Sequence, residues 1–438
     1  MADAATLFFI SIFGIVVKQH EAVFETAELA FSCAAFFGCC WALTRPYWGS
    51  ALAGFACGAS ILCSNLLVGA TVLVGCLMSH ILVRGIGDTS RKIFTTIAVA
   101  FVTFGLWPLV SYLLAGVVAG DYFNLWAQRQ IQIVGFFDPQ EILWFIKHFI
   151  WYLCPVWPFA FWAIWMWRKN LTVTHIALPL SFCFAWFVGF MLSSDVAAET
   201  LLSVTIAPLC VLATFGLMAC NRSTKSMLEL FSVAVFTLAL AGVWAYFIAW
   251  TLGFPPKMHW SILRLTADES VSHAHWVAVV LAAALLAFWL YLCVRRLMRR
   301  PIRFWTGPWL SASGITVLWI SAVCLFGPVI DSNRTFANIA REMTQELKTM
   351  HFVSGTDCVL AQTLPLSERA AIEWHSGVTL TASEAASCRF IISHVSAKRQ
   401  AKNPTKAPGF VVLKSFRPRS DTRYLLGPAG PVLIEKQF

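Results

Sequence analysis

The dominant feature of the chain is a series of long apolar segments separated by short polar ones. Most of these segments approach the length of about 20 residues that a helix needs to cross a hydrocarbon core of about 30 Å. They do not alternate in polarity as the strands of a membrane barrel do. The pattern therefore predicts an all-α polytopic membrane protein with about 10–11 transmembrane helices. Eleven segments are expected, at about 4–17, 26–44, 50–64, 66–83, 93–118, 142–167, 175–193, 200–219, 227–251, 275–294 and 305–330.

Two of these segments have informative lengths. The apolar run over 50–83 is too long for one ordinary span, and the polar residues at 63–65 predict a tight hairpin between two short helices. The first segment, 4–17, contains 14 residues, or about 21 Å of helix at 1.5 Å per residue. It is shorter than the hydrocarbon core, so we expect it to be the end of a longer helix.

Composition supports a membrane protein and gives its orientation. Of the 438 residues, 58% are hydrophobic and 12% are charged, whereas about 25% are charged in an average soluble protein. The loops at 84–92, 168–174, 220–226 and 295–304 contain 12 Lys and Arg residues, and the alternate loops contain three. The positive-inside rule places the first set in the cytoplasm, and the rest, with everything after about residue 331, outside. The net charge of +10 thus reflects topology, and we expect no nucleic-acid partner.

The sequence after residue 331 changes character. A polar segment at 334–350 has apolar residues at roughly helical spacing, and short strand-like runs follow it. We therefore expect a transmembrane domain over 1–330 and a small extracytoplasmic α/β domain over 331–438. Cys358 and Cys388 each begin a predicted strand on the side expected to be oxidising, so they form either a disulfide or two buried thiols.

The candidate chemistry lies at the predicted outer ends of helices. The sequence contains no Gly-rich phosphate loop, no paired CxxC site and no HExxH motif. An enzyme acting on lipid-linked phosphate needs a carboxylate that takes a proton and cations that hold phosphate. The residues of these types at the outer ends are Lys18, His20, Glu21, Glu25, Asp121, Arg129, Asp138, Lys147, His148, Asp195 and Glu199.

Two interpretations of these residues stay open. Lys18 to Glu25 is either an ordinary interfacial loop or a segment in which His20 and Glu25 face a cavity between helices. The loop at 120–148 is either an interfacial helix or a lid with Arg129 or Lys147 on phosphate. Neither reading supplies an obvious second carboxylate beside Glu25.

Several stretches resemble bacterial glycosyltransferase family 39, within the C-type superfamily of polytopic transferases. "KQHEAVFETAELAFSCAAFFG" resembles the family's outer-loop pattern of His followed five positions later by an acidic residue, with His20 and Glu25 in those places. "WFIKHFIWYLCPVWPFAFWAIWMWRKN" is similar to its span rich in Trp and Pro. The stretch at 175–213 resembles the helix pair around a further outer loop.

The resemblance implies an enzyme of the bacterial inner membrane that moves a sugar from an undecaprenyl-phosphate donor to a lipid or glycan acceptor on the periplasmic face. It implies that Glu25 and His20 are catalytic, and in some members a divalent metal ion assists. The bilayer, the donor and the acceptor are then the partners. Residues expected to bind substrate are Lys18, Arg129, Asp138, Lys147, His148 and Glu199.

The sequence also departs from the family pattern. Ala198-Glu199 replaces an Arg-Glu pair, "LLSV" replaces a Tyr-Leu-Leu-Pro-like run, and Ser64-Asn65 replaces a Lys-Gly pair. The family's large first outer loop with its acidic motif has no counterpart, so we expect the transmembrane domain to be incomplete at its N-terminus. Two other functions therefore stay open: an inactive or truncated relative with a structural or binding role, and a transporter of a polyprenyl lipid.

Overall fold

The structure is a computed structural model that describes residues 1–18, 24–83, 85–135, 142–193, 200–263, 274–298, 305–353, 357–361, 363–381, 388–396, 413–419 and 422–428. The chain forms two compact units. Unit 1 comprises Met1–Thr237 and Trp289–Trp319, and unit 2 comprises Leu238–Phe288 and Ile320–Phe438.

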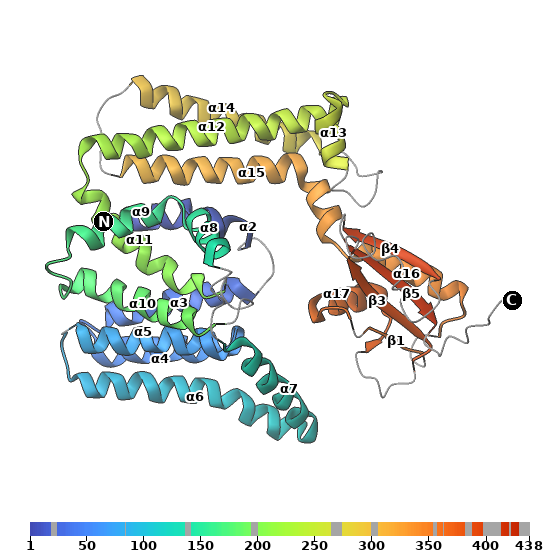
Figure 1. Cartoon of the computed structure of the whole chain (residues 1–438), viewed down its shortest axis with the longest axis horizontal. Helices are drawn as coiled ribbons and strands as arrows, with labels where there is room; N and C mark the ends of the chain where they lie inside the picture. The colour runs from blue at the N-terminus through green and yellow to red at the C-terminus, as the bar shows by residue number, and fades with distance from the viewer. Residues whose placement is uncertain are drawn as a thin grey trace. The chain divides into compact units, whose positions relative to one another are not determined.

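Unit 1 is a bundle of helices (Figure 1). It contains α1 (Ala2–Ser11), α2 (Phe13–Lys18), α3 (Phe24–Trp41), α4 (Pro46–Cys63), α5 (Leu66–Leu82), α6 (Thr89–Ala115), α7 (Val117–Ile133), α8 (Ile142–Tyr152), α9 (Val156–Met166), α10 (Thr174–Met191) and α11 (Leu202–Ala219). The boundary between the units falls within the long helices α12 (Arg222–Leu252) and α14 (Trp276–Met298), and within α15 (Thr306–Arg334). The short helix α13 (Pro256–Leu263) belongs to unit 2.

These helices confirm the prediction of a polytopic helical membrane fold. Within the described residues, six helices are long and apolar enough to cross a membrane, and the number rises to seven if the pair α8 and α9 is counted as one span. Each of the eleven predicted segments is helical, but three are interrupted. Ile12 separates α1 from α2, and Gly116 separates α6 from α7 within the predicted segment 93–118. The predicted span at 142–167 consists of α8 and α9, bent by 94°.

The predicted hairpin at 63–65 is also present. Helix α4 ends at Cys63 and α5 begins at Leu66, after the capping residue Asn65. The side-chain oxygen of Asn65 accepts a hydrogen bond of 2.9 Å from the backbone N–H of Val68. This bond satisfies one of the N–H groups that the first turn of a helix leaves without a partner.

Small residues let the helices of unit 1 approach closely. A Cβ atom on Gly38 of α3 would lie 2.7 Å from the backbone nitrogen of Ala53 in α4. A Cβ on Gly216 of α11 would overlap the backbone carbonyl of Phe159 in α9. In a membrane, burying an apolar side chain between helices gains little, because the lipid around the helices is equally apolar. Close packing of this kind therefore drives the association of membrane helices.

Unit 2 contains the C-terminal α/β domain that the sequence predicted. Its helices are α16 (Ala337–Thr349) and α17 (Leu366–Ser376), and its strands are β1 (Val359–Leu360), β2 (Leu380–Thr381), β3 (Phe390–Ser396), β4 (Lys414–Arg419) and β5 (Thr422–Pro428). The strand order is β2-β1-β3-β5-β4 (Figure 1). Strand β1 is parallel to β2 and β3, and β5 is antiparallel to β3 and β4.

The core of this domain lies between the sheet and its helices. Met343 and Leu347 of α16 and Ile372 of α17 are buried with Phe390 and Tyr424 of the sheet. A disulfide joins Cys358 to Cys388, with the Cα atoms 4.8 Å apart. That separation lies within the limit of about 7 Å for a bridge without backbone movement. The membrane side on which the domain lies, and a boundary at residue 330, stay predictions.

The contact at Gly216 gives a first prediction. Gly216→Ala should destabilise unit 1 by at least the 1–3 kcal/mol that is typical of overpacking, because the added methyl meets a backbone atom that cannot rotate away. Gly242→Ala in α12 is the control, since nothing lies within 4 Å of its Cβ position. Thermal unfolding in detergent compares the two variants. Equal stability of Gly216→Ala and Gly242→Ala would show that α9 and α11 are not in this close contact.

The disulfide gives a second prediction. It closes a sequence separation of 30 residues, for which chain entropy predicts about 3–4 kcal/mol of stabilisation. Replacing both cysteines by serine in the full chain should speed proteolysis within the C-terminal domain and leave the rest of the digestion pattern unchanged. Digestion at the wild-type rate would contradict the bridge.

Candidate active site

Two carboxylates lie one turn apart on α3. Glu28 is fully buried, with 0% of its surface exposed, and Glu25 is half-buried. Residues three apart on a helix share a face, so both side chains point toward the neighbouring helices. The Glu25 oxygen Oε2 is enclosed and has no hydrogen-bond partner among the described residues. Such a group costs free energy, about 1–3 kcal/mol or more when it is charged, which makes it a candidate functional group.

Glu28 is linked to α11, a helix far away in the sequence. The hydroxyl of Ser203 donates to Glu28 Oε1 across a sequence separation of 175 residues. The same hydroxyl lies 2.8 Å from the carbonyl oxygen of Thr200, which precedes α11. Since hydrogen bonds to charged groups are among the strong ones, this contact fixes the start of α11 against α3.

Further polar contacts gather helix ends near these carboxylates. The side-chain carbonyl of Gln130, near the end of α7, accepts a bond of 2.8 Å from the N–H of Leu66, the first residue of α5. The next residues after α7 meet the end of α10, where Gly135 N–H donates to the carbonyl of Leu192 at 3.0 Å. The starts of α3, α5 and α11 and the ends of α7 and α10 therefore form one polar end of unit 1.

An apolar cavity of about 540 Å³ adjoins this polar end. Helices α8, α9, α10 and α11 line it, mainly with aromatic and aliphatic side chains. Thr205, two residues after Ser203, is on its wall. Trp186 also lines it, and the indole Nε1 of this residue is enclosed without a hydrogen-bond partner in the described part of the chain. The described lining of this cavity is therefore almost entirely apolar.

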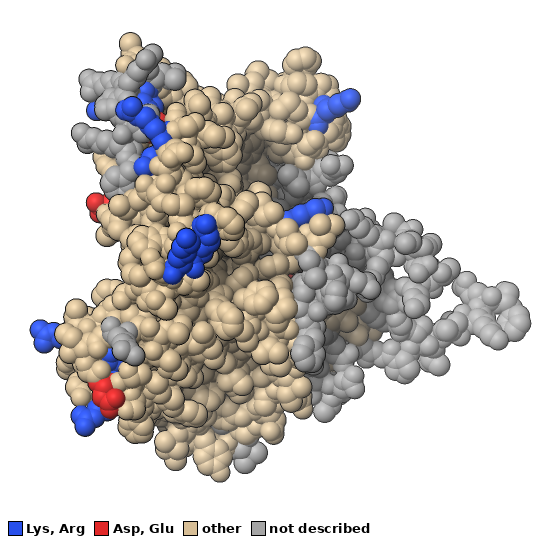
Figure 2. Space-filling model, turned by 60° about the vertical axis from the view of Figure 1, so that its left-hand side comes forward, with Lys and Arg blue, Asp and Glu red and all other residues tan. Residues whose placement is uncertain are grey.

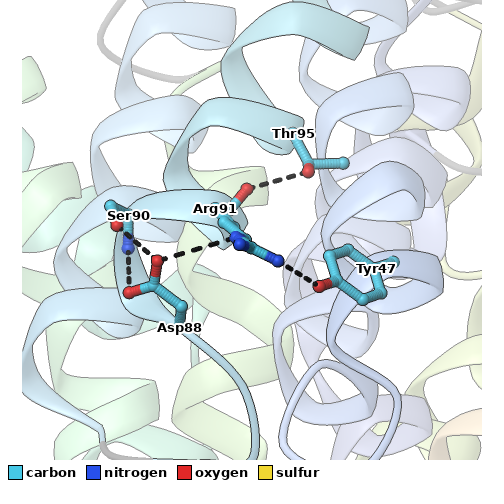
Figure 3. Close-up of polar contacts among 5 residues, drawn as sticks. All are labelled: Tyr47, Asp88, Ser90, Arg91 and Thr95. Carbon is cyan, nitrogen blue, oxygen red and sulfur yellow. Dashed lines mark hydrogen bonds and ion pairs between the residues drawn. The ribbon is translucent and has the colours of Figure 1, made fainter.

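The opposite end of unit 1 carries the basic loops. Figure 2 shows Lys and Arg side chains in separate groups on a surface that has few other charges. Asp88 caps α6, and the hydroxyl and N–H of Ser90 both donate to it (Figure 3). These bonds, with the nearby Arg91 guanidinium, hold the pKa of the Asp88 carboxyl below its usual value. Arg91 in turn lies 3.5 Å from the hydroxyl of Tyr47.

The structure brings together only part of the predicted site. Arg129 and Lys147 are exposed on α7 and α8, and neither bonds to the two carboxylates within the described residues. His148 is half-buried, on the same face of α8 as the buried Phe145 and Tyr152. Three predicted site residues and one side chain lie outside the described residues: His20, Asp138, Glu199 and the side chain of Lys18.

The sequence analysis missed Glu28 and Ser203. It assigned Glu25 alone and found no second carboxylate, whereas Glu28 is the more deeply buried of the pair. The spacing of three residues between the glutamates was the available signal. Among the described residues no group of three or more His, Cys, Asp or Glu side chains could hold a metal ion.

Comparison with known proteins assigns the fold. No protein-family model and no curated protein sequence matches the chain. The crystal structure of ArnT from Cupriavidus metallidurans bound to undecaprenyl phosphate matches with a TM-score of 0.57 and 16% identity, over 97% of this chain and 78% of that one. The apo structure of the same protein gives a TM-score of 0.45 and 15% identity, over 92% and 83% of the two chains. The first of these matches shows that the chain has an ArnT-like polytopic membrane fold.

The contact between Glu28 and Ser203 gives a third prediction. Ser203→Ala should destabilise the protein by about 1–3 kcal/mol, because the buried carboxylate loses its donor. Ser60→Ala is the matched control, since Ser60 is buried and its hydroxyl bonds to Ala56 of its own helix. A double-mutant cycle with Glu28→Gln, followed by thermal unfolding, measures the coupling. Additive effects of the two changes would show that the side chains do not interact.

Proposed function

We propose that this chain is a membrane glycosyltransferase that moves a sugar from an undecaprenyl-phosphate donor to a lipid or glycan acceptor. The observation that carries the proposal is the pair of carboxylates, half-buried Glu25 and buried Glu28, at one end of an ArnT-like bundle, beside an apolar cavity. A transferase of this class needs both parts. The cavity accommodates a lipid tail, and the carboxylates serve the polar chemistry.

The lipid tail of the donor suits the apolar cavity, and its phosphate suits the polar end. ArnT, the protein with the similar fold, has been crystallised with undecaprenyl phosphate. In this chain an isoprenoid tail would enter the cavity between α8 and α10, where Phe145, Phe149 and Phe184 are among the lining residues. The phosphate would then lie at the polar end. Arg129, Lys147 and His148 lie on α7 and α8, where the guanidinium and ammonium groups could pair with the phosphate and the imidazole could donate a hydrogen bond to it.

Glu25 is the group best suited to take the acceptor proton. Its enclosed Oε2 has no partner among the described residues, whereas Glu28 is tied to Ser203. In the reaction, the acceptor oxygen forms a bond to the anomeric carbon as its proton passes to Glu25. The bond from that carbon to the phosphate oxygen breaks, and undecaprenyl phosphate leaves. Glu28 positions the start of α3 through its bond to α11.

A divalent metal would add charge stabilisation of the departing phosphate. The two glutamates are carboxylates of the kind that would hold magnesium or manganese, with one Glu25 oxygen left to act as the base. Two protein carboxylates are enough for magnesium, which usually keeps several waters and binds substrate phosphates.

The orientation in the membrane follows from charge. We infer that the carboxylate end of unit 1 and the C-terminal α/β domain face the periplasm of a bacterial inner membrane. The bias of Lys and Arg toward the opposite loops supports this. The disulfide in the C-terminal domain also supports it, because disulfides persist in oxidising compartments.

The test is release of undecaprenyl phosphate from a panel of undecaprenyl-phosphate sugars by the full chain in bacterial membranes, read by mass spectrometry. Glu25→Gln should lower the rate by about 10²–10⁴-fold, because it removes the base and keeps the shape. Glu342→Gln, on the exposed surface of α16, removes the same charge and should leave the rate unchanged.

Other outcomes would exclude the proposal. If the wild-type chain moves the lipid between leaflets and leaves its sugar attached, the chain is a transporter. If it binds the lipid and neither cleaves nor moves it, the chain has a binding role. A rate that Glu25→Gln leaves unchanged would remove Glu25 from the reaction.

A further inference from the structure

A second unusual group lies at the basic end of unit 1, away from the carboxylates. Lys92, in the first turns of α6, has only 2% of its surface exposed. Its backbone N–H bonds to the carbonyl oxygen of Asp88 at 3.2 Å, but its ammonium group makes no hydrogen bond and no ion pair with any described residue. A buried ammonium group is unfavourable unless an anion or several acceptors compensate its charge. The stem of Lys92 is therefore buried, and its amine has no partner among the described residues, so an anion from outside the chain could compensate its charge.

The neighbouring helices contain no candidate partner. Helices α4, α5 and α6 have no Asp or Glu in their sequences. Asp88, in the adjacent loop, already accepts from Ser90 and pairs with Arg91 at 4.0 Å. His80 of α5 faces the same side of α6, but its Nε2 lies 3.2 Å from Thr96 Oγ1 and is engaged there. The charged side chains around Lys92 therefore carry a net positive charge.

The loop before α6 leaves the amine accessible. The side chain of Lys92 runs beneath Gly85 and Gly87, and a Cβ on Gly85 would lie 3.3 Å from its Nζ. Both glycines are exposed. Gly85 places no side chain over the amine, and its Cβ position is bordered by Leu43, whose Cα would lie 3.0 Å from it. Gly87 has a φ of +87°, which other residues rarely adopt, and it turns the chain into α6.

The surroundings indicate what kind of anion fits. Large apolar side chains project outward close to the loop, with Ile81, Ile86 and Phe94 exposed by 61%, 66% and 73%. On helices that cross a membrane, such side chains face the acyl chains of lipids. Arg45 and Arg91 are exposed nearby. A cationic pocket between membrane helices beside an apolar surface is the arrangement that recognises the phosphate of an anionic phospholipid.

We propose that Lys92, with the Gly85–Gly87 loop and the start of α6, forms a binding site for the phosphate of an anionic phospholipid headgroup. The site is separate from the carboxylate end of unit 1 and does not depend on the proposed transferase activity. Its role is to anchor α4, α5 and α6 to one leaflet. The bound phosphate compensates the charge of the buried amine.

The experiment uses the full chain in nanodiscs of phosphatidylcholine, with or without phosphatidylglycerol, and reads the melting temperature and the lipids retained in native mass spectrometry. Wild type should melt at a higher temperature with phosphatidylglycerol and retain it. Lys92→Met keeps the apolar stem and removes the charge, so it should lose that increase and the retained lipid. Lys169→Met, which removes an exposed charge at the same end, should keep both.

A second variant tests the site independently, in case Lys92→Met fails to fold. Gly85→Ala leaves the amine charged and places a methyl group over it, so it should also weaken the response to phosphatidylglycerol. If Gly85→Ala keeps the response to phosphatidylglycerol and Lys92→Met loses it, Lys92 binds the phosphate, which then approaches the amine from a side other than Gly85. If Lys92→Met keeps the full response, the proposal is wrong, and the amine serves only the packing of the loop.

A measurement with inorganic phosphate shows whether the site binds a lipid headgroup or a free phosphate ion. Added to phosphatidylcholine nanodiscs, it should not reproduce the stabilisation, because the apolar surroundings favour a phosphate that carries acyl chains. A full, Lys92-dependent stabilisation by inorganic phosphate would overturn the lipid assignment and make the site one for soluble phosphate.

Discussion

The structure of the polar end depends on the burial of one carboxylate, that of Glu28. Moving a carboxylate from water to an apolar surrounding is expensive, so the group is retained only where hydrogen bonds compensate part of the cost. Ser203 provides such a bond from α11. The contact sets the position of α3 relative to α11 and thus the position of Glu25, one turn earlier, whose enclosed oxygen remains available.

Close helix packing makes this arrangement possible. Glycines at the contacts of α3 with α4 and of α9 with α11 bring backbones together where no side chain would fit. The bend between α8 and α9 then leaves an apolar space beside α10, and the aromatic side chains of α8 and α10 line it. Glu25, Glu28 and Ser203 lie in the first turns of α3 and α11. Thr205, in the same part of α11, lines the apolar cavity.

The sequence alone predicted the features that depend on local pattern. Apolar segment lengths predicted the helices, the polar residues at 63–65 predicted the hairpin, and the change of composition after residue 331 predicted the C-terminal α/β domain. The bend between α8 and α9 was not expected, although Pro155 was a signal for it, because proline cannot continue a helix without losing a hydrogen bond. The break at Ile12 was missed because the apolar segment around it includes no proline.

The site was less predictable than the fold. Glu25 was found because an ionisable residue at a helix end is unusual in an apolar chain. Its neighbour Glu28 and the donor Ser203 were missed, since their contact joins residues 175 positions apart and leaves no periodic signal. Lys92 was counted only as one of the basic loop residues. Its burial depends on the loop that folds over it, which is a tertiary feature.

The central claim is that the polar end of unit 1 and the adjoining cavity together bind a polyprenyl phosphate. The most direct measurement is an experimental structure of the full chain with undecaprenyl phosphate, determined by electron cryomicroscopy in a lipid nanodisc. The account predicts isoprenoid density among Phe145, Phe149 and Phe184, with the phosphate at the end of the bundle where α3 and α11 begin. An empty cavity, with the lipid bound at the opposite end or on the outer surface of the helices, would contradict it.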